Sequence, residues 1–349
     1  MRPARPPVRS AAVRSAAVLA AVLGAAALGA CGVVPGDRDV LTVYSGRTEN
    51  LVGPLLEQYA ETADIDIEVR YGQSAELALL LVEEGDRSPA DVYLSQSPGP
   101  LGYLAGQDRL QDLPAEVLSL EGAGSRSTSG QWVGLSGRVR TVVYNTELVD
   151  PAQLPDSLLD LTAEEFRGRV AVAPTNGSFQ DFVTAFRELE GEDAARDWLA
   201  GMAANEAPAY ANNTAIVQAV ARGEVDMGLV NHYYNYQQLE EDPDSPTANH
   251  FFADGDVGNL LLEAGACVLT TADDPDRAAG FVEFLLSGEA QEFFTADTFE
   301  YPLAAGVEPP AELPPLEGLG VATFDLDELG GGLARTEELI RESGLDTDG

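Results

Sequence analysis

The chain has 349 residues, of which 45% are hydrophobic, and a formal net charge of −38. This length is sufficient for two domains with substantial cores, and the hydrophobic content excludes a wholly disordered chain in spite of the charge. Because the only charged residues among the first thirty are four arginines, the remainder carries 16 basic and 58 acidic residues, which excludes nucleic acid or an anionic membrane as the partner of its working face.

The N-terminal segment has the features of an export signal. Four arginines precede the apolar run Ala16–Leu28, and the run ends in Leu28-Gly29-Ala30-Cys31. A basic start, a short apolar stretch and small residues before a cysteine are typical of a secretory signal with a lipobox, not of a transmembrane span. We predict a signal peptide over residues 1–30, lipidation of Cys31, a tether over residues 31–39, and anchorage at the outer face of the cytoplasmic membrane.

The first part of the chain after the tether alternates strand and helix patterns. The predicted elements are a strand at Val40–Tyr44, a helix at Leu51–Tyr59, a strand at Ile65–Tyr71, a helix at Ala75–Val82 and a strand at Asp91–Leu94. Such a βαβαβ unit implies a parallel sheet with right-handed crossovers. The loops Ser45–Thr48 and Ser95–Ser97 then follow strands, at the edge where doubly wound sheets bind ligands.

In the middle of the chain, two strand patterns follow each other without a long helix between them before a second α/β set begins. Trp132–Leu135 and Val139–Tyr144 are predicted as two strands separated by Ser136-Gly137-Arg138, where the chain crosses between lobes. The remaining predicted elements are strands at Val170–Ala173, Met227–Val230 and Leu260–Leu269, with helices at Phe179–Leu189, Ala194–Met202, Ile216–Ala221, Ala278–Leu286, Ala290–Phe294 and Leu333–Ser343. We predict an α/β fold of two lobes, each a doubly wound sheet flanked by helices, with a hinge between them.

Two adjacent phenols stand at a corner of the second set. Asn231-His232-Tyr233-Tyr234-Asn235-Tyr236 follows the strand ending at Val230, and a helix is predicted from Tyr233 to Leu239. Both phenols would therefore lie beyond the carboxyl end of a strand, where open α/β sheets place their ligands. The alternative from composition alone is that one tyrosine packs in the core and the other lies on the surface.

Four motifs in register resemble the ferric-iron-binding solute-binding proteins of bacterial ABC transporters, from about Val40 to the C-terminus. The motifs are Leu41-Thr42-Val43-Tyr44-Ser45-Gly46, the segment Glu83–Tyr93, the segment Gly134–Tyr144 and Asn231-His232-Tyr233-Tyr234. The resemblance implies a periplasmic-binding-protein-like clamp, with one lobe formed by residues 40–138 and 265–314 and the other by residues 139–264 and 315–349.

The resemblance also implies a set of site residues. Tyr233 and Tyr234 fall on the two phenolate ligands of the family, and Tyr144 falls where some members supply a third. The residues matched to a synergistic anion such as carbonate or phosphate are Arg138, Arg140, Asn176, Gly177, Ser178, Asn213 and Asn231. Two positions depart from the pattern, because Thr48 stands where some members have a histidine and Gln96 where some have a glutamate.

The chemistry of ferric iron indicates which ligands are needed when the histidine and the glutamate are replaced by Thr48 and Gln96. Fe³⁺ is a hard acid that prefers anionic oxygen, and it must displace the proton of a phenol whose reference pKa is about 10. Two phenolates leave one positive charge uncompensated, and three cancel it. We therefore predict three tyrosine ligands, Tyr144, Tyr233 and Tyr234, together with a bound anion, while Thr48 and Gln96 line the cleft.

Structural roles remain open for several of these residues. Tyr144 fits an ordinary strand position, Arg138 and Arg140 fit ion pairs with nearby carboxylates, and Asn176-Gly177-Ser178 fits a helix cap. His232 is left out of the ligand set, because it would point away from Tyr233 on an extended backbone.

The predicted function is an extracytoplasmic, monomeric lipoprotein that captures ferric iron with an anion and delivers it to an ABC permease. One alternative keeps the clamp and replaces iron by a small organic solute such as a phosphonate, thiamine or a polyamine. Another is an adhesion or sensor domain. An extracellular enzyme is less favoured, since the sequence contains no nucleophile elbow, no HExxH motif and no Cys/His pair.

Overall fold

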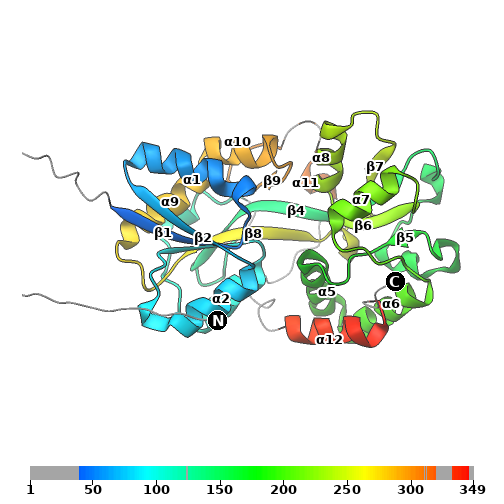
Figure 1. The fold of residues 1–349 in the computed structure, drawn as a ribbon, viewed down its shortest axis with the longest axis horizontal. Helices are drawn as coiled ribbons and strands as arrows, with labels where there is room; N and C mark the ends of the chain where they lie inside the picture. The colour runs from blue at the N-terminus through cyan, green and yellow to red at the C-terminus, as the bar shows by residue number, and fades with distance from the viewer. Residues whose placement is uncertain (1–38, 123–124, 310, 312, 320–331, 346–349) are drawn as a thin grey trace, which may run out of the picture. The chain divides into compact units, whose positions relative to one another are not determined.

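The computed structural model describes residues 39–345 except 123–124, 310, 312 and 320–331. The predicted signal peptide, Cys31 and nearly all of the tether lie outside the described residues. Within the described part of the chain, no helix combines the length and the apolar character needed to cross a membrane. The described residues form a mixed α/β fold (Figure 1).

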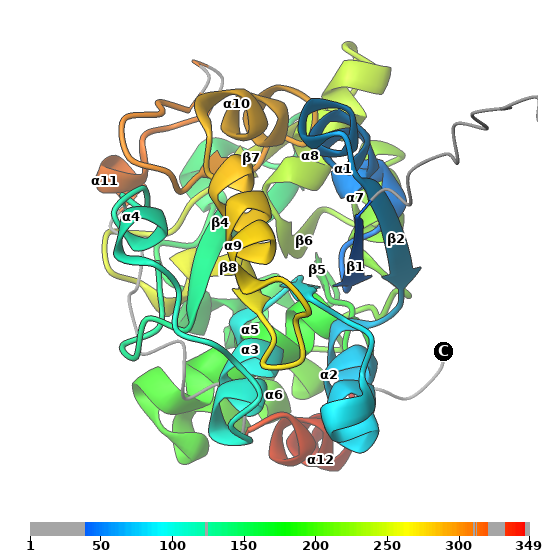
Figure 2. The same ribbon diagram turned by 90° about the vertical axis from the view of Figure 1, so that its left-hand side faces the viewer.

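The predicted βαβαβ unit is present at the start of the described chain. Its elements are β1 (Val40–Ser45), α1 (Glu49–Ala63), β2 (Asp66–Tyr71), α2 (Ser74–Glu84) and β3 (Val92–Ser95), followed by α3 (Pro98–Gly106) and α4 (Ala115–Leu118). Strand β1 pairs in parallel with both β2 and β3, as predicted. Figures 1 and 2 show α1, α9 (Pro275–Leu285) and α10 (Gly288–Ala296) on one side of these strands and α2 and α3 on the other.

Strand β4 is the longest of the described strands, and its extent shows that one prediction was wrong. It runs without interruption over Trp132–Asn145, so the two predicted strands are one, with a shift in register between Gly134 and Ser136. Its first part pairs with β8 (Leu261–Val268) and β9 (Tyr301–Pro302), and its second part pairs with β6 (Met227–Asn231) and β7 (Thr247–His250). Gly137 packs closely in this strand, because a Cβ there would lie 2.8 Å from the end of the Leu261 side chain, which would have to move.

The second α/β set also follows the prediction. It contains β5 (Val170–Ala171), α5 (Gly177–Glu190), α6 (Glu192–Ala204), α7 (Asn213–Ala221), β6, α8 (Tyr233–Glu241) and β7, and the chain later adds α11 (Leu316–Leu319) and α12 (Leu333–Ser343). Short 3-10 helices lie at Gly85–Arg87, Pro151–Gln153, Leu158–Thr162, Glu164–Phe166 and Val257–Asn259. The described strands form one sheet in the order β2-β1-β3-β8-β4-β6-β5, with β7 and β9 paired to β4.

The hydrophobic core is divided between two sets of elements that share β4. Val133 and Leu135 pack with residues from β1, α1, α9 and α10, whereas Val142 packs with residues from α5, α6 and α12. Each core buries several large side chains, and Trp132 and Trp198 are examples from the two sides. The fold is therefore a two-lobe α/β fold in which β4 and β8 continue through both sets of elements.

Candidate functional site

The two phenols form the first turn of α8, directly after β6. Tyr233 is buried and Tyr234 is half-buried, and their rings stack with centroids 4.2 Å apart at an interplanar angle of 28°. Tyr234 also packs against the core around α7 and β6. Consecutive side chains on a helix normally diverge, so the stacking brings two phenols together at the positive end of the helix dipole, which favours anionic oxygen.

The environment keeps Tyr233 protonated when nothing is bound. Burial, Tyr234 and Glu300 raise the pKa of the Tyr233 phenol well above its ordinary value, and the charge of Arg138 opposes them only in part. A cation that binds the phenol oxygen must therefore displace the proton, and binding of such a cation releases protons to solvent.

Arg140 is buried on β4 and is held by polar groups of β6 and α7. Its Nη1 donates to the Asn231 side chain at 2.9 Å and more weakly to that of Asn213 at 3.4 Å, and its Nη2 donates to the Leu229 carbonyl at 3.0 Å. Burial and the nearby charge of Arg138 lower the pKa of Arg140 to about 9, while the two phenols act in the opposite direction. Arg140 therefore carries a positive charge beside the phenols at neutral pH.

Arg138 has a different environment. Its side chain is fully buried, and none of its three guanidinium nitrogens has a hydrogen-bond partner among the described residues. Its positive charge acts to lower the pKa of four buried groups, those of Glu300, Asp181, Glu263 and Tyr233. A buried cation without hydrogen bonds costs free energy, so this guanidinium is suited to an anion that supplies the missing acceptors.

Five of the residues predicted to bind an anion form one polar network around the N-terminus of α5, namely Arg140, Asn176, Ser178, Asn213 and Asn231. The side-chain oxygen of Asn176 accepts from the Ser178 amide at 3.1 Å and from the Asn213 side chain at 3.2 Å. Asn213 in turn accepts from the Asn231 amide at 3.1 Å. Asn176 is thus the N-cap of α5, and Gly177 begins the helix with open space around its Cα. The structural role as a cap and a role in anion binding coexist here.

Tyr144 lies away from the phenol pair. It pairs with Met227 at the beginning of β6 and with Ala248 of β7, and its ring packs against the core around α5 and α6. Tyr233 follows the other end of β6, and the four steps along the strand from Met227 to Asn231 span about 13 Å at a rise of ~3.3 Å per residue. Tyr144 lies near the opposite end of β6 from the phenols, so its role as a third ligand stays a prediction.

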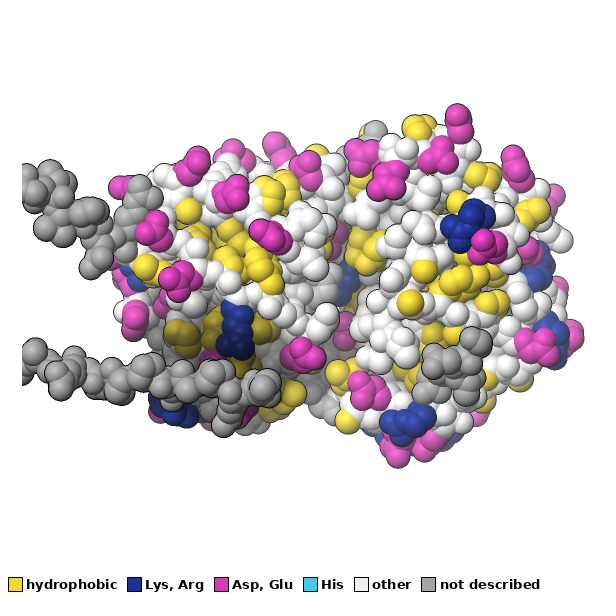
Figure 3. Space-filling view, viewed as in Figure 1, with side chains coloured by type: hydrophobic (Ala, Val, Ile, Leu, Met, Phe, Trp, Pro, Cys, Tyr) yellow, Lys and Arg dark blue, Asp and Glu magenta, His cyan; other side chains and the backbone are white. Residues whose placement is uncertain are grey.

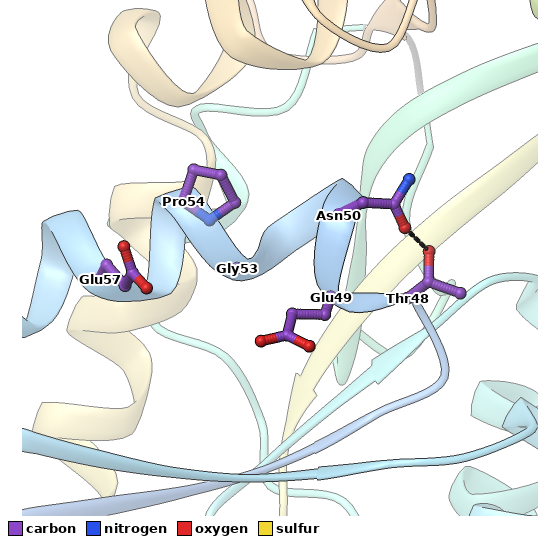
Figure 4. A pocket seen from close by; sticks show the side chains of 6 residues that line it. All are labelled: Thr48, Glu49, Asn50, Gly53, Pro54 and Glu57. Carbon is purple, nitrogen blue, oxygen red and sulfur yellow. Dashed lines mark hydrogen bonds between the residues drawn. The ribbon is translucent and has the colours of Figure 1, made fainter.

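Thr48 and Gln96 do not join the network around the phenols. The hydroxyl of Thr48 is exposed and donates to the side chain of Asn50 at 2.5 Å, and the backbone amide of Gln96 donates to the hydroxyl of Ser74. Thr48 lines an open hollow of about 550 Å³ on the first turns of α1 (Figure 4). This hollow is lined by Thr48, Glu49, Asn50, Gly53, Pro54 and Glu57. Neither phenol contributes to it, so it is separate from the phenol site.

Sequence reasoning missed a buried ion pair next to the phenols. Arg47 donates from Nη2 to Glu300 at 2.5 Å and from Nη1 to the Ser136 hydroxyl at 3.0 Å, and both charged side chains are buried. Burial acts to raise the pKa of Glu300, but Arg47, Arg138 and Ser136 together lower it below its ordinary value. Arg47 directly precedes Thr48, whereas Glu300 is far along the chain. The only feature of the sequence that could have indicated this pair was the presence of Arg47 in a chain with few basic residues.

A second missed residue links α5 to the loop after β3. The side chain of Ser97 lies near the carboxyl of Asp181 on α5 and favours its charged form. Burial raises the pKa of Asp181 to about 6, although Arg138 and Arg140 favour its charged form. Ser97 is the N-cap of α3, so this contact joins the two sets of elements beside the anion network.

His232 has a structural environment. The sequence reasoning left this residue out on the premise of an extended backbone, whereas its φ of −54° and ψ of −39° are helical. Both ring nitrogens are engaged by backbone groups, and burial lowers the pKa of the imidazole to about 4. Among the described residues, no three His, Cys, Asp or Glu side chains gather in a way that would hold a metal ion. The phenols stay the metal-ligating groups that we predict for this site.

The chain matches the family model of bacterial extracellular solute-binding proteins over residues 88–322. It belongs to this family. The Fe(3+)-binding periplasmic protein of Serratia marcescens is 31% identical over 308 residues, covering 87% of this chain and 90% of the relative. The major ferric iron-binding protein of Neisseria meningitidis serogroup A is 35% identical over 283 residues, covering 80% of this chain and 85% of the relative.

Solved structures of solute-binding proteins show the same fold. Iron-bound HitA from Pseudomonas aeruginosa superposes with a TM-score of 0.82 at 34% identity, covering 88% of this chain and 99% of the other. A Trichodesmium protein in complex with iron and citrate superposes with a TM-score of 0.77 at 26% identity, covering 88% of this chain and 100% of the other. This solute-binding protein therefore resembles iron-carrying members along most of its length.

Proposed function

We propose that this solute-binding protein captures ferric iron together with an anion outside the cytoplasmic membrane and delivers it to an ABC permease. The observation that carries the proposal is the stacked pair Tyr233 and Tyr234 at the N-terminus of α8, beside the unpartnered guanidinium of Arg138. The names of the relatives from Serratia and Neisseria support iron as the cargo. The protein acts as a carrier and not as an enzyme.

Charge balance explains why an anion accompanies the metal. Without Tyr144, two phenolates leave one positive charge on Fe³⁺ and too few oxygens around it. Arg138 and Arg140 attract an anion to the same place, and the N-terminus of α5 adds backbone amides. Carbonate, phosphate or a carboxylate such as citrate satisfies both the metal and the guanidinium, and the citrate complex of the Trichodesmium protein supports this arrangement.

The proposed lobes meet on β4. Residues 40–138 and 265–314 form the first lobe and residues 139–264 and 315–349 the second, so that the boundary falls between Arg138 and Val139 on β4. The division of the hydrophobic core supports this assignment. The phenols belong to the second lobe, and closure of the lobes over bound iron is driven by contacts that form only in the closed state.

The sequence supports a location at the membrane, and the residues that indicate it lie outside the described part of the chain. The signal peptide over residues 1–30 and the lipobox ending in Cys31 direct export and lipidation, and the protein acts as a monomer tethered to the outer face of the membrane. Mass spectrometry of the membrane fraction tests this point: a Cys31→Ser variant is expected to lose the lipid and the membrane association. Retention of the membrane association by that variant would show another anchor.

The visible spectrum of the purified protein tests the iron assignment. Tyrosinate-iron complexes absorb visible light by charge transfer, so ferric citrate with bicarbonate or phosphate is expected to colour the protein. A variant carrying both Tyr233→Phe and Tyr234→Phe serves as the colourless control. If the wild-type protein itself stays colourless after removal of unbound iron, iron is not the cargo.

An organic anion without iron is the second candidate. The unpartnered guanidinium of Arg138 next to two stacked rings favours a phosphonate over a polyamine, because the two buried arginines repel cations. Calorimetry with a metal-free phosphonate separates this case: tight binding in the presence of a chelator supports the organic ligand, and its absence together with the visible band supports iron.

A further inference from the structure

The imidazole of His232 connects the first turn of α8 to two distant segments. His232 directly precedes Tyr233, and its side chain is fully buried. Its Nδ1 accepts the backbone N–H of Val139 on β4 at 3.1 Å, and its Nε2 donates to the backbone carbonyl of Phe299 at 2.8 Å. The backbone amide of His232 also donates to the Val139 carbonyl at 3.0 Å. His232 and Val139 therefore form a reciprocal pair that continues the β4–β6 ladder beyond its last strand residue.

The two side-chain bonds require a neutral imidazole with one tautomer. A neutral ring has one acceptor and one donor, and here both are used by partners of opposite kind. The acceptor faces Val139 and the donor faces Phe299, so the ring cannot flip without losing both bonds. The side chain of His232 is thus fixed in orientation as well as in place.

The two partners lie where the proposed lobes meet. Val139 forms the last β4 pair with β8, and Arg140, the next residue, forms the first pair with β6. Phe299 lies between α10 and β9, and β9 pairs with Gly137 of β4. One imidazole therefore ties the phenol-bearing helix to the crossing strand and to a segment of the other lobe.

Aromatic contacts hold the Phe299 segment against α8. Phe299 has a φ of +58°, a left-handed conformation that is unfavourable for a bulky residue. Its ring stacks on Tyr236 of α8 with centroids 5.9 Å apart, and the ring of Tyr301 lies 4.9 Å from that of His232. The bond from His232 to the Phe299 carbonyl belongs to the interactions that maintain this strained backbone.

We propose that His232 is a positioning residue for the phenol pair. Its two hydrogen bonds fix the rotation of the first turn of α8, so that both phenol oxygens point toward one ligand before that ligand arrives. A site oriented in advance avoids the free energy of ordering two side chains during binding. The inference rests on the proposed function in that the ligand is ferric iron, but the positioning itself is a property of the ligand-free protein.

Two substitutions separate the two bonds. Asparagine places an acceptor near the position of Nδ1, so His232→Asn retains the bond from Val139 and loses the bond to Phe299. Glutamine places a donor near the position of Nε2, so His232→Gln retains the bond to Phe299 and loses the bond from Val139. The matched control is His250→Gln. His250 is the other histidine of the chain and lies on β7, and its Nε2 donates to the Pro155 carbonyl at 2.7 Å.

The first measurement needs no iron. In protein labelled with 3-fluorotyrosine, the ¹⁹F resonances of Tyr233 and Tyr234 are assigned from the two Tyr→Phe variants. Both resonances are expected to shift or broaden in His232→Asn and in His232→Gln and to stay in place in His250→Gln. Unchanged resonances in both His232 variants would overturn the inference, whatever the cargo is.

The second measurement uses ferric iron with bicarbonate. We expect each His232 variant to bind iron about 10- to 100-fold more weakly in competition with citrate, with a shifted charge-transfer band, as for an outer-shell partner of a metal ligand. Wild-type affinity and an unshifted band in both variants, with only a lower Tm, would reduce His232 to a structural residue. A colourless wild-type protein with shifted ¹⁹F resonances in the variants would instead reject iron and keep the positioning role.

Discussion

At the residue scale, the proposed capture of iron depends on two phenolic protons that the metal must displace. Burial raises the pKa of Tyr233, so its oxygen is not an anion before binding. The metal supplies the free energy for deprotonation, and its apparent affinity therefore increases with pH. The stacked rings and the helix N-terminus hold the oxygens in place but do not ionise them.

Removal of either hydroxyl tests whether both phenols are ligands. Tyr233→Phe and Tyr234→Phe each remove one oxygen and keep the ring that stacks on its neighbour. We expect each to weaken iron binding by more than the roughly 10- to 100-fold effect of an outer-shell partner, measured by competition with citrate. Tyr144→Phe is the control, and its affinity should equal that of the wild type. A loss in Tyr144→Phe as large as in the other two would contradict the separation of Tyr144 from the pair.

The unpartnered guanidinium leads to a prediction that separates binding from stability. Arg138→Met removes a buried charge that makes no hydrogen bond to the described residues, so the free energy of unfolding without ligand should change by no more than about 1 kcal/mol. Iron binding, in contrast, should lose its dependence on bicarbonate or phosphate concentration. Chemical denaturation and iron titrations at two anion concentrations measure the two effects. A loss of several kcal/mol without ligand would assign Arg138 a structural role.

At the scale of elements, the sequence predicted most of the architecture because hydrophobic periodicity is a local property. The βαβαβ unit, the helices α5 to α7 and the corner between β6 and α8 all lie within a few residues of their predicted bounds. The error at β4 has a tertiary cause. Ser136-Gly137-Arg138 has the composition of a turn, and it remains extended because β8 and β9 pair with it. Pairing partners so distant in sequence cannot be inferred from the segment itself.

The site was predictable to the extent that it follows from motifs and strand ends. The phenol pair follows a strand, as predicted, and Arg140 and the three asparagines, which only the resemblance had singled out, form one hydrogen-bonded network. Tyr144 lies at the far end of β6 from the phenol pair, and a motif does not specify at which end of an antiparallel strand a side chain lies. The Arg47–Glu300 pair was missed because nothing local connects two residues that are 253 positions apart.

Strand β8 carries a buried carboxyl that makes stability depend on pH. Glu263 is 5% exposed, its Oε1 accepts from the Ser125 hydroxyl at 2.8 Å, and its Oε2 has no partner among the described residues. Burial raises the pKa of Glu263 from 4.5 to about 7, with Ser125 and Arg138 opposing the rise and Glu121 adding to it. Between pH 4.5 and about 7, the folded protein therefore binds a proton at Glu263 that the unfolded protein has released.

Stability should fall as pH rises through this window. The contribution of protonated Glu263 is complete below pH 4.5 and is lost as the pH passes 7, and the difference in pKa corresponds to about 3 kcal/mol. Glu263→Gln keeps a neutral side chain at every pH, so it should be more stable than the wild type at pH 8 and similar to it at pH 4. Urea denaturation at several pH values measures this. Glu76→Gln, at an exposed position on α2, is the control, and equal pH profiles for all three proteins would contradict the prediction.

At the scale of the whole molecule, the acidic surplus and the buried arginines have separate roles. Figure 3 shows acidic side chains spread over the visible face, with arginines beside acidic residues at several points. Arg47, Arg138 and Arg140 are in contrast buried. The negative surface favours solubility and repels other anions, whereas the buried guanidinium groups attract an anion into the site. The positive charges at the site thus act at short range, in surroundings of low dielectric constant.

Closure of the lobes is expected to accompany iron binding. The phenols follow β6, which pairs with the second part of β4, and the proximity of Ser97 to Asp181 supports the proposal that the first lobe reaches α5 beside the anion network. Bound iron and its anion add attraction between these surfaces, which shifts the population toward the closed form. Small-angle scattering should therefore show a decrease in the radius of gyration on the order of 1 Å, against about 20 Å expected for a folded chain of about 310 residues. The variant with both phenols replaced by phenylalanine should show no decrease under the same conditions. An unchanged radius in the wild type, at iron concentrations that produce the full visible band, would mean that the site binds iron without closure.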